Sequence, residues 1–190
     1  MNLIKKFLFL DSINNYVSRN ISKIKDISIV VLINPHKLNN QIKNNNFYKI
    51  INFCKGNKLP FFVSDDYKLA VKTKANGIYL KSSNKRMIFN NSEKKIITIG
   101  TAHNQLEYYF KKKQNCSLIF LSPIFITKKH SINKALGPVK FNLITSAWKV
   151  KFGCLGGLTV NNLKKTRLTF ASSIGFQSLI YDKQKKTRLL

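Results

Sequence analysis

The chain has 190 residues, of which 44% are hydrophobic, and this length and composition are those of one globular domain. Its 34 Lys and Arg residues outnumber the 7 Asp and Glu, so nucleic acid, membrane surfaces and phosphorylated metabolites are all candidate partners. The three cysteines are widely separated and form no CxxC pair, which argues against a disulfide-rich secreted protein. The apolar runs are far too short for a signal peptide or a membrane span, so the sequence predicts a cytoplasmic protein.

Eight short apolar runs recur along the chain, and longer polar segments with helical spacing lie between them. The runs are Phe7–Leu10, Ile27–Ile33, Phe61–Val63, Gly77–Leu80, Ile96–Gly100, Ser117–Leu121, Phe152–Leu155 and Ser173–Ile180. Most are continuously apolar, which is typical of parallel strands covered by helices. The alternation predicts an α/β fold, a single (β/α)8 TIM-type barrel over residues 1–190. Periodicity alone also permits a doubly wound open sheet, although no GxGxxG follows the first run.

The segments between the runs indicate helices and their caps. After the fifth run, Leu106, Tyr109 and Phe110 predict one apolar helix face at i, i+3 and i+4. Asn104 precedes this helix, and the pair Asn161–Asn162 precedes a later one, so all three are candidate caps. The stretch 81–95 is polar and predicts a short or irregular fourth helix.

In barrels of this kind, function gathers in the loops after the carboxyl ends of the strands. After the third run, Asp65 and Asp66 stand side by side in a chain that has few acids. One reading is a divalent-cation site and the other is a cap for the next helix, and position alone does not decide between them. After the fifth run, Thr101 and His103 stand where a substrate could reach them, although a single His before a helix is more often structural.

The sixth and seventh loops carry the most chemistry. After the sixth run, Thr127 and Lys128–Lys129 offer hydroxyl and cationic donors to a polyphosphate, or else form a solvated basic loop. After the seventh run, Gly156–Gly157 let backbone N–H groups approach an anion at the start of a helix. Ser178 in the eighth run faces this loop, which predicts the phosphate site that the last two loops of such barrels share.

Six ordered stretches of the chain resemble the thiamine phosphate synthase/TenI family. They are Leu59–Asp66, Ala75–Leu80, Ile99–His103, Leu121–Lys128 followed by Ala135–Pro138, Leu155–Leu158 and Ser173–Phe176, so the family motifs run from about residue 59 to residue 180. The resemblance implies a (β/α)8 barrel and an enzyme of thiamine biosynthesis, a thiamine-phosphate diphosphorylase. Synthase members of the family join hydroxymethylpyrimidine diphosphate to a thiazole phosphate, release pyrophosphate and use Mg²⁺.

The same resemblance implies roles for individual residues. Asp65 would ligate the metal, with Ser64 beside it in place of the family's usual Asn and also near the substrate. Thr101 and Lys129 would be catalytic. The phosphate groups of the small heterocyclic substrates would be held by Thr127, Lys128, Gly156, Gly157 and Ser178. The resemblance does not decide which of the two lysines faces the site.

The chain departs from the family pattern at three places. After the second strand, the family has an Arg-x-Lys type pair that grips the diphosphate, whereas this chain offers only Lys37. After the fourth strand, Asn84 stands where the family supplies a second metal carboxylate, and a neutral ligand weakens magnesium binding. Pro123 stands where the tautomerase branch carries a catalytic His, so that activity is not implied.

Three functions therefore remain open. The first is a divergent synthase in which Lys37, Lys81 or the general basic field replaces the missing Arg-x-Lys pair that binds the diphosphate. The second is a TenI-like barrel that binds a phosphorylated thiazole or another heterocycle without synthase activity. The third is a basic nucleic-acid-binding protein. Only charge favours the third, since the aromatic residues fall within predicted core elements and do not interleave with basic ones. No specific nucleic acid and no membrane is predicted as a partner, and the oligomeric state is left open.

Overall fold

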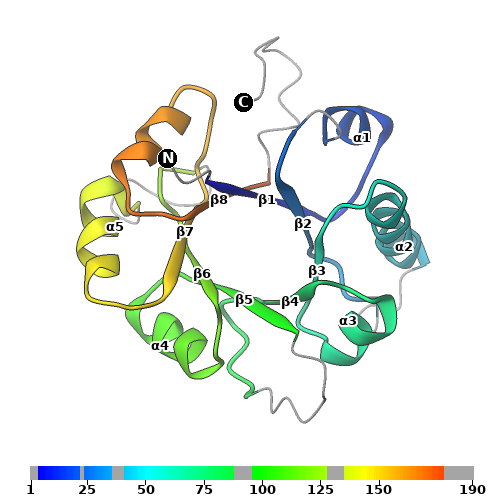
Figure 1. Ribbon diagram of the computed structural model, residues 1–190, viewed down its shortest axis with the longest axis horizontal. Helices are drawn as coiled ribbons and strands as arrows, with labels where there is room; N and C mark the ends of the chain where they lie inside the picture. Colours follow the sequence, from blue (N-terminus) through cyan, green and yellow to red (C-terminus); the bar gives the residue numbers. More distant parts are fainter. Residues whose placement is uncertain (1–3, 22–23, 36–40, 88–95, 128–134, 178–190) are drawn as a thin grey trace.

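The computed structural model describes residues 4–21, 24–35, 41–87, 96–127 and 135–177 of the chain. Eight parallel strands close into a barrel in which each strand pairs with its neighbours in sequence and β1 also pairs with β8 (Figure 1). The strands are β1 (Lys5–Leu10), β2 (Ile27–Val31), β3 (Phe61–Ser64), β4 (Gly77–Leu80), β5 (Ile97–Ala102), β6 (Leu118–Leu121), β7 (Lys151–Leu155) and β8 (Ser173–Phe176). The predicted barrel is confirmed, and closure rules out the open sheet.

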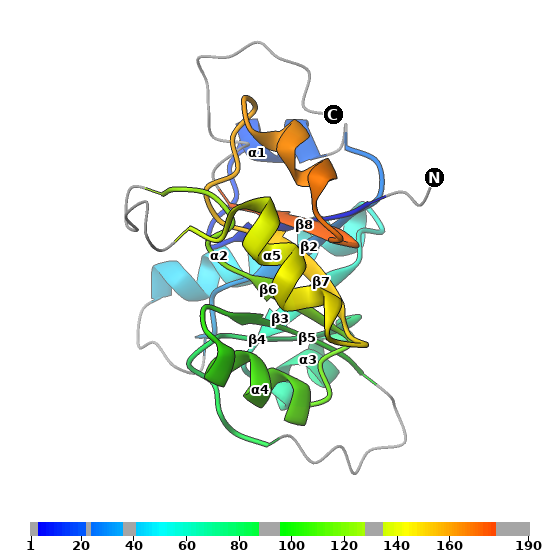
Figure 2. The same cartoon turned by 90° about the vertical axis from the view of Figure 1, so that its left-hand side faces the viewer.

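The helices lie outside the ring of strands (Figure 1), and Figure 2 shows α4 and α5 covering the strands behind them. They are α1 (Asn15–Ile21), α2 (Gln41–Gly56), α3 (Tyr67–Thr73), α4 (Gln105–Lys113) and α5 (Gly137–Ser146), with a 3₁₀ helix η3 (Leu163–Leu168) after β7. The described residues that follow β4, 81–87, contain a turn and no helix. The rest of the stretch for which the sequence predicts a short or irregular helix, residues 88–95, lies outside the described residues.

The inside of the barrel is filled by aromatic side chains. Phe7 and Phe9 of β1 pack against Phe120 of β6 in edge-on contacts, with ring centroids 5.2 and 5.4 Å apart. Strand glycines provide the room for these rings, because a Cβ added at Gly153 or Gly175 would lie 2.6 Å from an aromatic ring. A second apolar layer lies between the strands and the helices. The interior is thus a packed core, and in barrels of this kind the functional site is expected at the carboxyl ends of the strands.

The predicted apolar face of α4 is wrong. Leu106 is 60% exposed and Tyr109 46% exposed, whereas Tyr108 and Lys111 are the buried side chains of this helix. The aliphatic part of Lys111 runs over Gly100, where a Cβ would lie 2.7 Å from its Cδ. The hydrophobic period therefore predicted where the helix lies but not which of its faces is buried. The aliphatic part of a lysine can occupy a buried position when its ammonium group is hydrogen-bonded.

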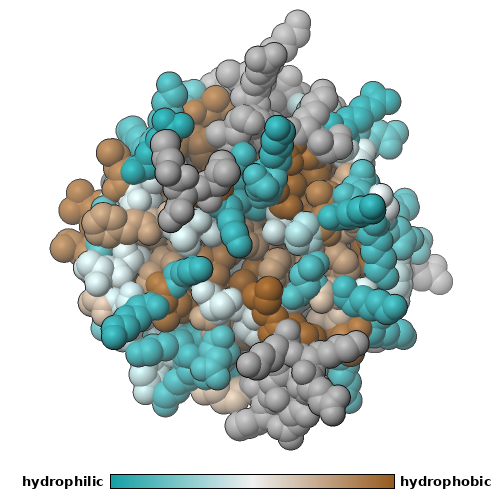
Figure 3. Space-filling view, in the orientation of Figure 1, coloured by the Kyte–Doolittle hydropathy of each residue, from teal (hydrophilic) through white to brown (hydrophobic). Residues whose placement is uncertain are grey.

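In Figure 3, hydrophilic side chains lie along the right-hand and lower-left edges of the face, and hydrophobic side chains lie along its left edge and near its centre. Within the described ranges, none of the helices has the length and apolar character needed to cross a bilayer.

Candidate functional site

The carboxylate of Asp65 lies at the carboxyl end of β3 and faces the end of β4. Its backbone adopts the left-handed conformation (φ 54°), which Asp tolerates better than most residues. Its Oδ1 atom accepts two hydrogen bonds, from the Lys81 backbone N–H at 3.1 Å and from Asn84 Nδ2 at 2.8 Å. These bonds join the β3 and β4 loops at the barrel mouth.

Asp66, the neighbour of Asp65, has the structural role that sequence position left open. It is the N-cap of α3, and its Oδ1 accepts from the Leu69 backbone N–H at 2.9 Å. Its Oδ2 lies 3.4 Å from Asn34 Nδ2, which connects α3 to the end of β2. Asn104 caps α4 in the same way as predicted, accepting from the Glu107 N–H at 2.9 Å. Of the two adjacent acids, therefore, only Asp65 faces the mouth.

Ser64 and Thr101, two predicted site residues, are both buried below the mouth. The Ser64 hydroxyl donates to the Val31 carbonyl at 2.7 Å, so it fastens β3 to β2. The Thr101 hydroxyl lies 2.7 Å from the phenol oxygen of Tyr79 inside the barrel. Burial raises the pKa of Tyr79 to about 12; the Thr101 hydrogen bond opposes this shift, and the charge of Asp65 adds to it. The phenol therefore stays protonated at neutral pH.

Sequence reasoning missed a buried polar network behind the β4 loop. Lys111 Nζ donates to the Asn84 carbonyl at 2.7 Å and to Gln114 Oε1 at 3.0 Å. Gln114 Nε2 in turn donates to the carbonyls of Asn84 and Arg86, at 3.0 and 2.8 Å. Burial lowers the pKa of Lys111. The only signal in the sequence was the i, i+3 spacing of Lys111 and Gln114, which many exposed helices share.

On the opposite side of the mouth, the β6 and β7 loops pack closely on one another. Gly156 and Gly157 both have positive φ, 85° and 71°, and a Cβ at Gly157 would overlap the backbone carbonyl of Phe125. The Phe125 N–H donates to the Gly156 carbonyl at 3.2 Å, and Asn162 Nδ2 donates to the Gly157 carbonyl at 2.8 Å. Asn162 thus stabilises the glycine turn, although its side chain does not cap η3 as the sequence predicted.

Thr127 follows directly on the segment that packs against Gly157. Its Oγ1 is buried and has no hydrogen-bond partner among the described residues. A buried hydroxyl without a partner is uncommon and costs about 1–3 kcal/mol. The other predicted groups of this half, Lys128, Lys129 and Ser178, lie outside the described residues, as does Lys37.

The comparisons with known proteins agree with this geometry. A family model described as thiamine monophosphate synthase matches residues 20–180, most of the chain. The chain belongs to the thiamine monophosphate synthase family. Its barrel is similar to the structure of thiamine phosphate pyrophosphorylase from Pyrococcus furiosus, with a TM-score of 0.68, 16% identity, and coverage of 93% of this chain and 87% of that one. At this identity the likeness establishes the fold.

Two curated members of the family are similar in sequence. The chain is 26% identical to the thiamine-phosphate synthase of Staphylococcus haemolyticus over 135 residues, which cover 69% of this chain and 63% of that protein. It is 28% identical to the thiamine-phosphate synthase of Prochlorococcus marinus over 120 residues, which cover 60% of this chain and 33% of that protein. The matched stretch thus spans less than two thirds of the length of either relative.

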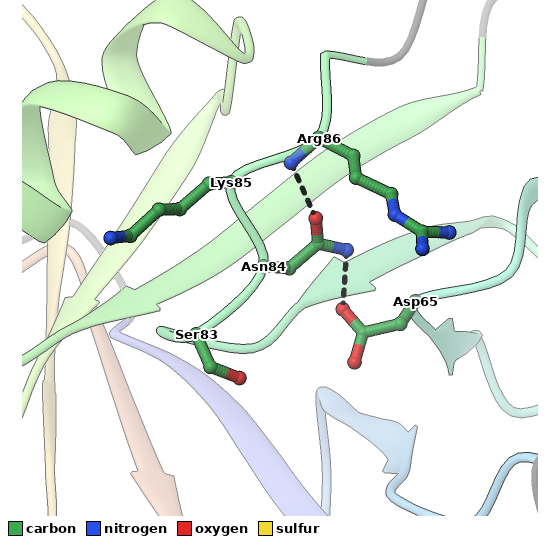
Figure 4. Close-up of a pocket in the computed structure, with 5 residues that line it drawn as sticks. All are labelled: Asp65, Ser83, Asn84, Lys85 and Arg86. Atoms are coloured by element: carbon green, nitrogen blue, oxygen red, sulfur yellow. Dashed lines mark hydrogen bonds between the residues drawn. The ribbon is translucent and has the colours of Figure 1, made fainter.

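The pocket beside Asp65 has more cationic than acidic residues in its lining. It has a volume of about 190 Å³ and is lined by Asp65, Ser83, Asn84, Lys85 and Arg86 (Figure 4). The lining contains one carboxylate and two cationic side chains. Across the described part of the chain, no group of three or more His, Cys, Asp or Glu side chains could hold a metal ion.

Proposed function

We propose that this chain is a divergent thiamine phosphate synthase. In the proposed reaction, the C–O bond between the pyrimidine methylene and the diphosphate breaks, and its electron pair leaves with pyrophosphate. The lone pair of the thiazole nitrogen then forms the new C–N bond to the methylene carbon. The residues need to supply little covalent chemistry, because the pyrimidine ring stabilises the methylene cation; they must hold two anionic substrates and neutralise the leaving group.

The observation that carries this proposal is the glycine turn at Gly156–Gly157 beside the unpartnered Thr127 hydroxyl. Left-handed φ values at both glycines give the turn a backbone shape that side chains would obstruct. A backbone turn of this kind and a free hydroxyl donor are suited to a phosphate monoester. We assign this side of the mouth to the thiazole phosphate, with Lys128, Lys129 and Ser178 as further predicted ligands.

Thr101 is the proposed polar group nearest the reacting atoms. It is buried directly below the mouth, at the carboxyl end of β5, and its hydroxyl is held in place by Tyr79. A hydroxyl so fixed can orient one substrate atom without moving during the reaction.

Magnesium, which the family implies, does not fit the donor groups at Asp65. Asp65 is the single carboxylate of the pocket, and its Oδ1 already accepts two hydrogen bonds. The amide of Asn84 presents its NH₂ group to that carboxylate, and a cation would need the amide oxygen instead. The metal-ligand role of Asp65 therefore stays a prediction from the resemblance, and no step of the proposed reaction depends on it.

Turnover of the two thiamine precursors tests the proposal directly. Purified protein is incubated with hydroxymethylpyrimidine diphosphate and thiazole phosphate, and thiamine phosphate and pyrophosphate are measured. Thr127→Val removes the hydroxyl with little change in shape, so we expect the KM for thiazole phosphate to rise about tenfold. Thr145→Val is the matched control, since its hydroxyl bonds within α5, away from the mouth.

A second candidate function is binding of a phosphorylated heterocycle without turnover. The hydrogen-bonded Asp65–Asn84 pair favours it, because the resemblance implies that this pair stands in the place of the family's two metal carboxylates. Clear binding of thiazole phosphate, weakened in Thr127→Val, together with no product would select this second function over the first.

A further inference from the structure

The polar contacts of Asn84 fix which way its amide points. A carboxylate can only accept, so the atom 2.8 Å from Asp65 Oδ1 must be the amide nitrogen. The amide oxygen accepts from the Arg86 backbone N–H at 2.9 Å, which agrees with this orientation. Both ends of the amide are thus used within the protein, and the pocket presents its cationic groups to a ligand.

Arg86 and Lys85 are neighbours in sequence but have different surroundings. Figure 4 shows the guanidinium of Arg86 on the same side of the loop as Asp65, making no hydrogen bond to the other residues drawn. Lys85 extends to the opposite side, where its Nζ lies 5.5 Å from the centre of the Phe110 ring. Of the two cations, Arg86 is the one that a ligand in the pocket would meet.

The backbone that carries Arg86 is held at both of its polar atoms. Its N–H donates to Asn84 Oδ1, and its carbonyl accepts from the buried Gln114 at 2.8 Å. Lys111, also buried, holds the preceding Asn84 carbonyl at 2.7 Å. An arginine on a fixed backbone loses less entropy on binding than one on a free loop. The network behind the loop is therefore suited to present a guanidinium to an anion.

Lys81 adds a second cation at the same edge of the barrel mouth. Its backbone N–H donates to Asp65, and its Nζ reaches across to the Leu32 carbonyl at 3.2 Å, at the end of β2. The ammonium therefore lies between the β2 and β4 ends, beside the pocket. With Lys81 and Arg86 around one carboxylate, the local field favours an anion over a divalent cation.

We propose that this pocket binds the diphosphate group of the pyrimidine substrate directly, with the Arg86 guanidinium taking the place of a bound metal ion. This inference rests on the proposed synthase function. A planar guanidinium can donate two parallel hydrogen bonds to phosphate oxygens, and its positive charge neutralises the leaving group as the C–O bond breaks.

Calorimetric titration of the full chain with inorganic pyrophosphate, at physiological ionic strength and in the presence of EDTA, tests this proposal. We expect one site that is occupied without metal. Arg86→Ala should weaken it about tenfold or more, and Arg86→Lys should recover part of the loss. Lys113→Ala is the matched control, because it removes the same charge from the surface of α4, where its Nζ lies over the Tyr109 ring and not in the pocket; it should change the affinity by about threefold or less.

Asp65→Asn gives a second readout. Direct binding by Arg86 and binding through a metal ion predict opposite changes in the affinity for pyrophosphate. The Asn oxygen can still accept from Lys81 and Asn84, and Asn tolerates the left-handed backbone, so the loop should keep its structure. Without the negative charge, pyrophosphate should bind a few times more tightly in EDTA. A metal ligand at this position predicts that binding needs Mg²⁺ and is lost in Asp65→Asn.

The outcomes separate this inference from the proposed function. Three results would overturn the inference: pyrophosphate binding that requires Mg²⁺, binding that Arg86→Ala and Lys113→Ala weaken equally, or no binding at all. Metal-free binding lost in Arg86→Ala supports it even when the precursors give no thiamine phosphate, and in that case only the synthase proposal fails. Circular dichroism and melting curves of each variant establish that it is folded.

Discussion

The two sides of the barrel mouth differ in the kind of atom that they present. On the β3–β4 side the contacts are made by side chains: Asp65, Asn84 and Arg86, supported by Lys111 and Gln114. On the β6–β7 side they are made mainly by backbone, at Gly156 and Gly157, which pack on the neighbouring loop.

This difference would account for a family pattern that, by the resemblance, is kept at Gly156–Gly157 and changed at Asn84. A site built from side chains changes its chemistry with one substitution, as the resemblance implies for Asn84 in the place of a carboxylate. A site built from backbone depends on turn shape and loop packing, which many side chains elsewhere can support. The β6–β7 side should therefore be sensitive to shape, and the β3–β4 side to charge.

The largest effect should come from a change of shape at the glycine turn. Gly157→Ala places a Cβ against the Phe125 carbonyl at a residue with φ 71°, and should lower the free energy of unfolding by about 2–4 kcal/mol. Gly137→Ala is the control, since its φ is also positive (63°) but its Cβ would meet nothing within 4 Å. Urea denaturation measures both. Equal losses would show that backbone conformation, and not loop packing, makes Gly157 necessary.

On the β3–β4 side, the largest change should follow the loss of the buried lysine. Lys111→Ala removes the donor to the Asn84 carbonyl and leaves space over Gly100, so we expect a loss of about 2 kcal/mol. Lys113→Ala, on the same helix but stacked on Tyr109 at the surface, should cost less than about 1 kcal/mol. Chemical denaturation compares the two variants. If they cost the same, the network behind the β4 loop contributes nothing to stability.

Restoring the second carboxylate should reverse the charge preference of the β3–β4 side. Asn84→Asp places two carboxylates together and should create a magnesium site. Mg²⁺ at about ten times its Kd should then stabilise the variant by about 1.4 kcal/mol, with no matching change in the unmodified chain. Melting curves with and without Mg²⁺ measure this. Stabilisation of the unmodified chain by Mg²⁺ would mean that Asp65 alone holds the ion.

Alkaline pH should weaken the barrel as a whole, because it contains buried thiols. Burial raises the pKa of Cys116 to about 12 and that of Cys154 to about 11, from 9.0. Above pH 9 the folded protein therefore keeps thiol protons that the unfolded chain releases. The full free energy of unfolding is present below pH 9 and falls as pH rises toward 11 or 12. Each thiol should cost about 1 kcal/mol between pH 9 and pH 10.

Urea denaturation at several pH values measures that slope, and the difference between the unmodified chain and Cys154→Ala isolates one thiol. If removal of the thiol leaves the slope unchanged, Cys154 ionises freely in the folded protein.

Much of the architecture could be predicted from sequence because it depends on local pattern. The run Gly77–Leu80 coincides with β4, and Asp66 and Asn104 cap the helices that they precede. What local pattern could not supply was orientation. Leu106 and Tyr109 have helical spacing, yet the helix turns them outward and buries Lys111, because only the assembled barrel brings an acceptor to that ammonium.

The sequence by itself determined the alternation of strands and helices, the family and the loops in which chemistry should occur, because strand composition, turn glycines and motif order are properties of the chain alone. Tertiary structure decided the use of each polar group. Three such choices depend on partners distant in sequence. They are the orientation of Asp65 rather than Asp66 toward the mouth, of Arg86 rather than Lys85 toward Asp65, and of the Asn84 amide nitrogen toward the Asp65 carboxylate. Hydrogen bonding is directional and requires both partners to be in place, so these choices exist only once the strands have closed.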